Sequence, residues 1–121
     1  MTGIKVSSII AEFCEAAIEK GDFESTPKLD RELHSRMAKS ISRLNSLGEA
    51  GLRSIEALLK HQSPYVRSWA AAELLANGNE KAIPVLIGLT NQGGLIATSS
   101  RMVLQEYEAG MLRSPFGTNA A

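Results

Sequence analysis

Apolar residues recur every three or four positions along most of the chain, which is the spacing of helices with one buried side. The clearest stripe lies in residues 29–44, where apolar side chains follow at four-residue steps and close with a three-residue step. Its members are Leu29, Leu33, Met37, Ile41 and Leu44. No segment alternates apolar and polar residues for long, as a half-buried strand would. The pattern predicts an all-helical domain.

Capping and turn residues divide this pattern into six expected helices. Thr26-Pro27 and Ser63-Pro64 each place a capping residue directly before a proline, as at the start of many helices. Glycines stand at most of the expected helix ends. The expected helices cover residues 6–20, 26–47, 49–60, 64–77, 79–89 and 95–110. In the third and fifth of them, the residues expected to face inward include Leu52, Ile55, Leu86 and Ile87.

The later expected helices repeat one another in pairs. Residues 49–52 are similar to residues 80–83, at an offset of 31 positions. In the helices that follow, Val66, Ala70 and Leu74 match Ile96, Ser100 and Leu104 at an offset of 30. A period near 30 with two helices in each unit is typical of an α-solenoid.

Residues 58–67, with the sequence Leu-Leu-Lys-His-Gln-Ser-Pro-Tyr-Val-Arg, and the small residues that follow them resemble a short HEAT repeat of the bacterial kind. The whole chain is also similar to a bacterial family of small HEAT-like domains that has no assigned activity. His61 and Ser63 stand where such repeats often carry acidic residues, and the second copy lacks the arginine of the Val-Arg pair. The resemblance implies an α-α superhelix of three antiparallel hairpins, as a single domain over residues 1–112. Residues 113–121 are small and polar and, apart from Phe116, are expected to form a short, flexible tail.

Composition narrows the classes of function. Thirteen basic residues balance thirteen acidic ones, so the net charge is zero. The molecule as a whole therefore does not attract nucleic acid or an anionic membrane. The single cysteine, Cys14, excludes a disulfide within the chain and is typical of a reducing compartment. The apolar run at residues 83–89 is far shorter than a membrane span. We therefore expect a cytoplasmic protein that does not associate with membranes.

Chemically active groups do not converge in the sequence. His34 and His61 lie in different expected elements, each without a second metal ligand at helical spacing. Cys14 lies on the apolar stripe of the first helix, as a small buried hydrophobe does. We therefore expect no catalytic residues, no metal and no cofactor. Glu73 is unusual, because it follows Trp69 by one helical turn and would need a cationic or hydroxyl partner if buried. Whether this pair is structural or functional stays open.

These observations favour a small, non-enzymatic module that binds a protein partner. Solenoids offer a face built from the second helix of each hairpin. On that face we place Arg31, Ser35, Lys39, Tyr65, Ser68, Ala72, Thr98, Arg101 and Gln105. The surface is mildly basic and suits an acidic helix or loop, although it could also be an ordinary solvated face.

Two alternative functions remain. The second helix could bind nucleic acid through a basic stripe of Arg36, Lys39 and Arg43, although Glu32 is spaced to pair with Arg36 and an isoelectric point near 6.7 argues against this function. An enzyme with an unrecognised site is the other alternative. The sequence leaves the partner and the oligomeric state open.

Overall fold

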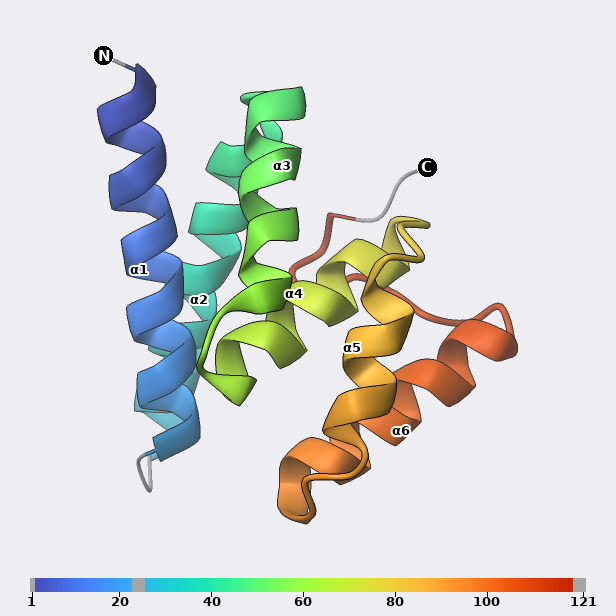
Figure 1. The fold of residues 1–121 in the computed structure, drawn as a ribbon. Helices are drawn as coiled ribbons and strands as arrows, with labels where there is room; N and C mark the ends of the chain where they lie inside the picture. The colour runs from blue at the N-terminus through green and yellow to red at the C-terminus, as the bar shows by residue number, and fades with distance from the viewer. Residues whose placement is uncertain (1, 23–25, 119–121) are drawn as a thin grey trace. The chain divides into compact units, whose positions relative to one another are not determined.

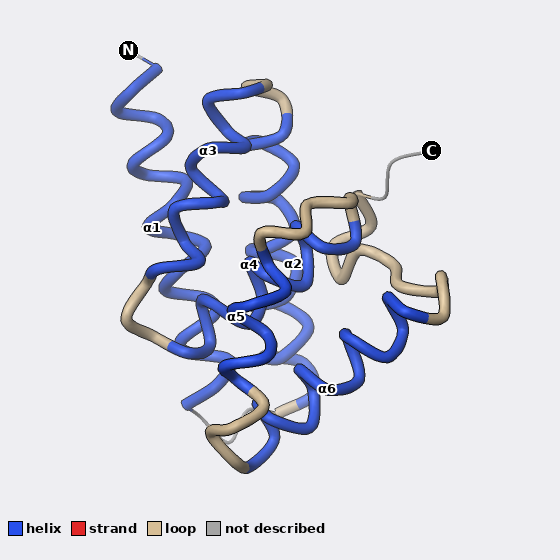
Figure 2. The backbone as a smooth tube through the Cα atoms, turned by 45° about the vertical axis from the view of Figure 1, so that its right-hand side comes forward, coloured by secondary structure: helices blue, strands red, loops and turns tan. Residues whose placement is uncertain are grey.

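The structure is a computed structural model, and it describes residues 2–22 and 26–118. Within these ranges it contains six α-helices, one short 3-10 helix and no strand, which confirms the all-helical class (Figures 1 and 2). The α-helices are α1 (Thr2–Asp22), α2 (Pro27–Asn45), α3 (Glu49–Ala57), α4 (Pro64–Ala76), α5 (Ala82–Leu89) and α6 (Gly94–Glu108). The 3-10 helix η1 (Leu58–Lys60) connects α3 to α4.

Both expected cap-and-proline sequences begin helices. Thr26 is extended, and its Oγ1 accepts a hydrogen bond from the Leu29 amide at 3.1 Å, directly before α2. Ser63 is extended before α4. The fifth helix begins at Ala82, later than expected, because the Asn79 side chain accepts from the Lys81 amide at 3.1 Å and forms a turn first.

The chain divides into two compact units, Met1–Ala57 and Leu58–Ala121. The sequence predicts one domain over residues 1–112. The division falls inside the expected helix at residues 49–60, where the α-helical conformation changes to the 3-10 conformation.

The first unit consists of α1, α2 and α3, each of which contacts the other two. Its buried residues include the expected stripe of α2 from Leu33 to Leu44, and Phe13 and Ala17 of α1. On α3 the buried residues are Gly51 and Ile55, while Leu52 is 42% exposed. The expectation that Leu52 faces inward is therefore wrong. The inward position belongs to Gly51, whose backbone lies directly against α2.

In the second unit, α4 contacts η1, α5 and α6, and α5 also contacts α6. The expected core residue Val66 is fully buried. Ala70 of α4 and its repeat equivalent Ser100 of α6 are buried as well. On α5 the inward residues are Ala82, Leu86 and Leu89, so Ile87 is turned about 100° away from Leu86 and is 52% exposed, against expectation.

The two repeat copies make their turns in different ways. Before α4, Arg67 donates Nη1 hydrogen bonds to the carbonyl oxygens of His61, at 2.7 Å, and Gln62, at 3.0 Å. The Ser63 amide donates to His61 Nδ1 at 3.0 Å. The arginine of the Val-Arg pair therefore holds this turn. In α6 the equivalent position is Ala97, and Gly93 and Gly94 make the turn before this helix with φ of 78° and 68°.

The segment after α6 is the one for which the sequence predicts a short, flexible tail, at residues 113–121. Residues 113–118 are described by the structure, and their side chains contact α4, as detailed below. Residues 119–121 of the expected tail lie outside the described residues. Among the helices described, none is both long and apolar enough to cross a membrane.

Candidate functional site

The outward side of α2 carries a group of exposed cations. Its residues lie on one side of the helix, opposite the buried stripe. We call this surface the α2 face and define it as Lys28, Arg31, Ser35, Lys39, Ser42 and Arg43, all of which are exposed. Glu32 is an exposed acid beside them. Four cations and two hydroxyl groups therefore share one side of a single helix.

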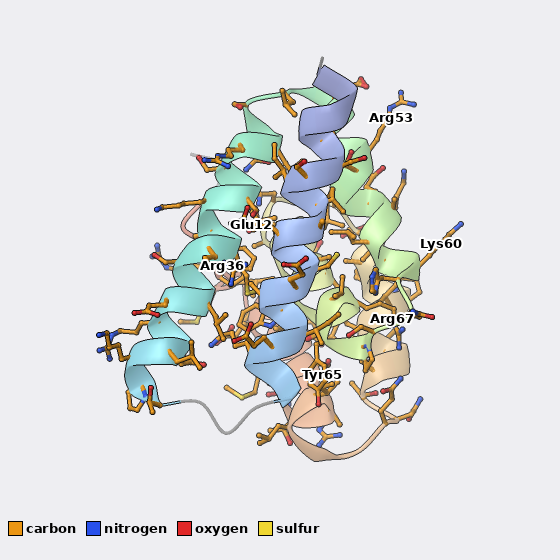
Figure 3. All side chains as sticks on the ribbon, turned by 90° about the vertical axis from the view of Figure 1, so that its left-hand side faces the viewer. Glu12, Arg36, Arg53, Lys60, Tyr65 and Arg67 are labelled. Atoms are coloured by element: carbon orange, nitrogen blue, oxygen red, sulfur yellow. The ribbon has the colours of Figure 1, made fainter. Side chains whose placement is uncertain are left out.

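Charges at the contact between α1 and α2 are paired, unlike those of the α2 face. Arg36 of α2 lies beside Glu12 of α1 (Figure 3), at 3.7 Å from Nε to Oε1. Its Nη2 lies 3.9 Å from Glu15 Oε1. Lys20 donates to Asp30 at 2.5 Å. The expected pairing of Arg36 with Glu32 is therefore replaced by a pairing with α1. Arg36 therefore contributes to the contact between α1 and α2, and its charge is not free for a basic stripe on α2.

The four cations of the α2 face have no such partners among the described residues. Within these residues, no ion pair or side-chain hydrogen bond engages Lys28, Arg31, Lys39 or Arg43. Their charges are thus available to a ligand. Of the stripe proposed for nucleic acid, Lys39 and Arg43 remain available and Arg36 is engaged.

The nine residues expected to bind a protein are distributed over both units. Arg31, Ser35 and Lys39 are exposed on α2, and Thr98, Arg101 and Gln105 are exposed on α6. On α4, Tyr65 and Ser68 are half-buried, whereas Ala72 is 7% exposed. Ala72 lies among the buried residues of α4, so the expectation that it belongs to an exposed surface is wrong. The Arg101 guanidinium donates to the Thr90 carbonyl at 3.4 Å.

A second candidate site surrounds Glu73, whose residue surface is only 2% exposed. Its Oε2 accepts a hydrogen bond from Asn77 Nδ2 at 3.0 Å. Its Oε1 accepts from Ser114 Oγ at 2.5 Å, and its Oε2 also accepts from the Thr118 hydroxyl. The expectation of a hydroxyl partner is met by two hydroxyls, and no described cation forms an ion pair with this carboxylate.

Trp69 lies one helical turn before Glu73 and contacts the same segment. Its ring centroid is 5.6 Å from that of Phe116, with the two planes tilted by 43°. Offset and tilted pairs of this kind add to the stability gained from burying the rings. We call Trp69, Glu73 and Asn77 the α4 cradle. The pair that sequence reasoning left unassigned is thus the surface that holds residues 114–118.

Residues 114–118 form a compact turn within the cradle. Ser114 Oγ accepts from the Phe116 amide at 3.0 Å and lies 3.0 Å from Thr118 Oγ1. The Gly117 amide donates to the Ser114 carbonyl at 3.3 Å, and Gly117 has a φ of 76° that favours glycine. The turn therefore directs three side chains toward α4, those of Ser114, Phe116 and Thr118.

The Cys14 thiol is buried in the first unit. Burial, and next the nearby charge of Glu15, raise the pKa of the Cys14 thiol above its ordinary value. Its thiolate is therefore disfavoured, which opposes a nucleophilic role. No group of three His, Cys, Asp or Glu residues in the described ranges could hold a metal ion. Comparison with protein-family models, curated proteins and solved structures finds no match, so the α2 face and the α4 cradle are interpreted from their own residues.

Proposed function

We propose that this protein is a non-enzymatic binding module whose α2 face docks an acidic segment of a partner protein. One observation carries the proposal. Four cations on one side of a single helix are exposed, and they lack ion-pair partners among the described residues. Complementary charge across an interface speeds association and selects partners.

The dimensions of the α2 face suit a short helix or extended segment. With a rise of about 1.5 Å per residue, the distance along α2 from Lys28 to Arg43 is about 22 Å. Ser35 and Ser42 lie between the cations, and their hydroxyls can donate to carboxylates or to backbone carbonyls. An acidic helix of about four turns would meet the whole face.

Charge around the face favours an acidic protein segment over nucleic acid. The unit Met1–Ala57 contains eight basic and nine acidic residues, so it has no excess positive charge. Glu12 and Glu15 of the neighbouring α1 are exposed beside Arg36. A long polyphosphate chain would extend past the α2 face toward these carboxylates, whereas a short acidic segment need not.

We propose further that the helices follow a HEAT-like superhelix. Three observations in the second unit support this. The repeat-equivalent helices α4 and α6 contact each other, both contact α5, and their equivalent residues Ala70 and Ser100 are both buried. An experimental structure in which α4 and α6 are not roughly parallel would reject the superhelix and leave the α2-face proposal standing.

Charge reversal on the α2 face tests the binding function. The variant Arg31→Glu/Lys39→Glu is compared with the control Arg53→Glu/Lys60→Glu, which reverses two exposed cations outside the α2 face (Figure 3). The probes are a glutamate-rich helical peptide of about 15 residues and a single-stranded DNA of similar length. Surface plasmon resonance at low and high salt gives the association rates.

We expect the wild type and the control to bind the acidic peptide with salt-sensitive rates. The α2 variant should bind it at least about tenfold more slowly. Circular dichroism should show unchanged helix content in both variants, because exposed substitutions usually change stability by less than about 0.5 kcal/mol. Equal peptide binding by the α2 variant would reject the proposal, and stronger binding of DNA than of peptide would favour the nucleic-acid alternative.

A further inference from the structure

Burying the carboxylate of Glu73 costs free energy, because the group loses its hydration. This cost points to a role in selecting which groups lie against the carboxylate. A buried carboxylate loses its hydration, and a well-packed apolar residue at such a position is often as stable or more stable. Glu73 is nevertheless 2% exposed, and its hydrogen bonds come from the neutral groups of Asn77, Ser114 and Thr118. The carboxylate therefore specifies what may lie against it: a group that donates hydrogen bonds and carries no negative charge.

The segment that meets this requirement has the form of a bound peptide ligand. Its three anchoring side chains are spaced two residues apart, as hydroxyl, aromatic ring and hydroxyl. Ser114 and Thr118 donate to the same carboxylate, and Phe116 contacts Trp69 between them. The segment comes from 41 to 45 positions later in the chain and belongs to no helix.

We propose that the α4 cradle is a peptide-binding site for a segment with the spacing hydroxyl–X–aromatic–X–hydroxyl. Residues 114–118 are its resident ligand, and the site takes the same segment from a second copy of this chain when its own is released. This inference is independent of the α2 face, because it uses residues of the Leu58–Ala121 unit alone.

The site rejects segments that carry acid at either hydroxyl position. A carboxylate or phosphate at position 114 or 118 would place a second negative charge against the buried Glu73 carboxylate. It would also remove the hydroxyl donor that the carboxylate needs. A phosphoserine at position 114 therefore releases the segment, whereas exchange of serine for threonine keeps the donor.

The resident segment competes strongly with any added peptide for binding to the α4 cradle, because it is attached to the same chain. Only five residues, 109–113, separate the end of α6 from Ser114. A short linker of this kind gives the attached ligand an effective concentration in the millimolar range. A peptide in trans is therefore measurable only when the resident segment is weakened.

The test uses the full-length chain with the substitutions Phe116→Ala and Thr118→Ala, which weaken the resident segment and leave the α4 cradle unchanged. The probe is the synthetic peptide Arg-Ser-Pro-Phe-Gly-Thr, the sequence of residues 113–118. Trp69 is the only tryptophan of the chain, so tryptophan fluorescence reports directly on the cradle. Two control peptides carry the changes Phe116→Ala and Ser114→Asp.

We expect a saturable change of Trp69 emission when the native peptide is added to the variant. The two control peptides should bind at least about tenfold more weakly, and the wild-type chain should respond at least about tenfold less than the variant. Absence of a saturable change up to about 5 mM peptide, in a variant with native helix content, would overturn the proposal. Equal binding of the Ser114→Asp peptide would overturn it as well.

Should the double variant fail to fold, the single variant Thr118→Ala takes its place, since it removes one hydroxyl and keeps the Phe116 ring. A second measurement uses the Thr118→Ala chain, whose resident segment is weakened, and a peptide with fluorinated phenylalanine. A fluorine resonance of the bound peptide that the native unlabelled peptide displaces supports the site. A spectrum identical to that of the peptide alone at millimolar concentrations contradicts it.

Discussion

Gly51 of α3 lies so close to Leu44 of α2 that a Cβ atom at position 51 would come within 1.7 Å of the Leu44 carbonyl oxygen. The obstacle is backbone, which cannot rotate away as the end of a side chain can. This contact decides which side of α3 faces inward. Gly51 and Ile55, one turn apart, are buried, and Leu52 is left exposed.

Gly51→Ala should therefore destabilise the protein, although alanine normally favours helices. Alanine in place of glycine contributes about 1 kcal/mol to helix stability, but here α3 must move away from α2, as in an overpacked core. We expect the free energy of unfolding to fall by about 2 kcal/mol or more, measured by urea denaturation. Gly88→Ala is the matched control, because nothing lies within 4 Å of its Cβ position, and it should be neutral or stabilising.

Ser100→Ala should stabilise the protein or leave its stability unchanged. Among the described residues, the Ser100 hydroxyl is a buried side-chain group without a hydrogen-bond partner. Removing an unsatisfied buried hydroxyl avoids a desolvation penalty of about 1–3 kcal/mol, and the repeat-equivalent position in α4 is already Ala70. Thermal denaturation compares this variant with Ser99→Ala, an exposed control. A loss of more than about 1 kcal/mol in Ser100→Ala alone would show that the hydroxyl has a partner.

Cys14 should make the protein less stable in alkaline solution. Burial and then Glu15 raise the pKa of its thiol, so between the unfolded and folded pKa values the folded state binds more protons than the unfolded state. Its contribution to stability is therefore complete below the ordinary thiol pKa, about 8.5, and is lost as pH rises through the folded pKa.

The pH dependence of urea denaturation checks this prediction, with Cys14→Ala as the comparison. The slope of the wild type above about pH 8.5 should exceed that of the variant. The pKa of Tyr107 is also raised, by its hydrogen bond to Glu80, but this contribution is common to both proteins and cancels. Parallel slopes would mean that the thiol ionises as easily in the folded state as in the unfolded state.

The features that sequence reasoning predicted correctly depend on neighbouring residues. Thr26 caps the helix that Pro27 begins, and the buried side of α2 follows its three- and four-residue spacing. The burial of Val66 and the need of Glu73 for a hydroxyl partner were also readable, because helix geometry and the cost of burying charge set them locally.

The features that sequence reasoning missed depend on residues that are far apart in the chain. Arg36 was expected to pair one turn away on its own helix, but α1 brings two carboxylates to it. The contacts of Ser114 and Phe116 with α4 were not predicted, because the composition of residues 113–118 is small and polar and their partners lie more than 40 positions earlier in the chain. The position of Leu52 depends on the approach of α3 to α2 at Gly51, which no local pattern encodes.

Removing the negative charges of Glu12 and Glu15, which lie beside the α2 face, should speed the association of an acidic peptide. Glu12 and Glu15 share one cationic partner, Arg36, at 3.7 and 3.9 Å, and both are exposed next to the helix that we propose binds acidic segments. Their carboxylates repel such a ligand during its approach. The variant Glu12→Gln/Glu15→Gln should therefore associate with the glutamate-rich peptide about two- to fivefold faster than the wild type at low salt.

The increase should disappear at about 0.5 M salt, where charges more than a few ångströms apart are screened. Stability should change by less than about 1 kcal/mol, because exposed ion pairs contribute little. Lys39→Gln provides the opposite control, since it removes a cation of the α2 face and should slow association under the same conditions. If both variants bind the peptide at the wild-type rate at low salt, then the acidic segment docks elsewhere on the protein, and the α2 face is an ordinary solvated surface.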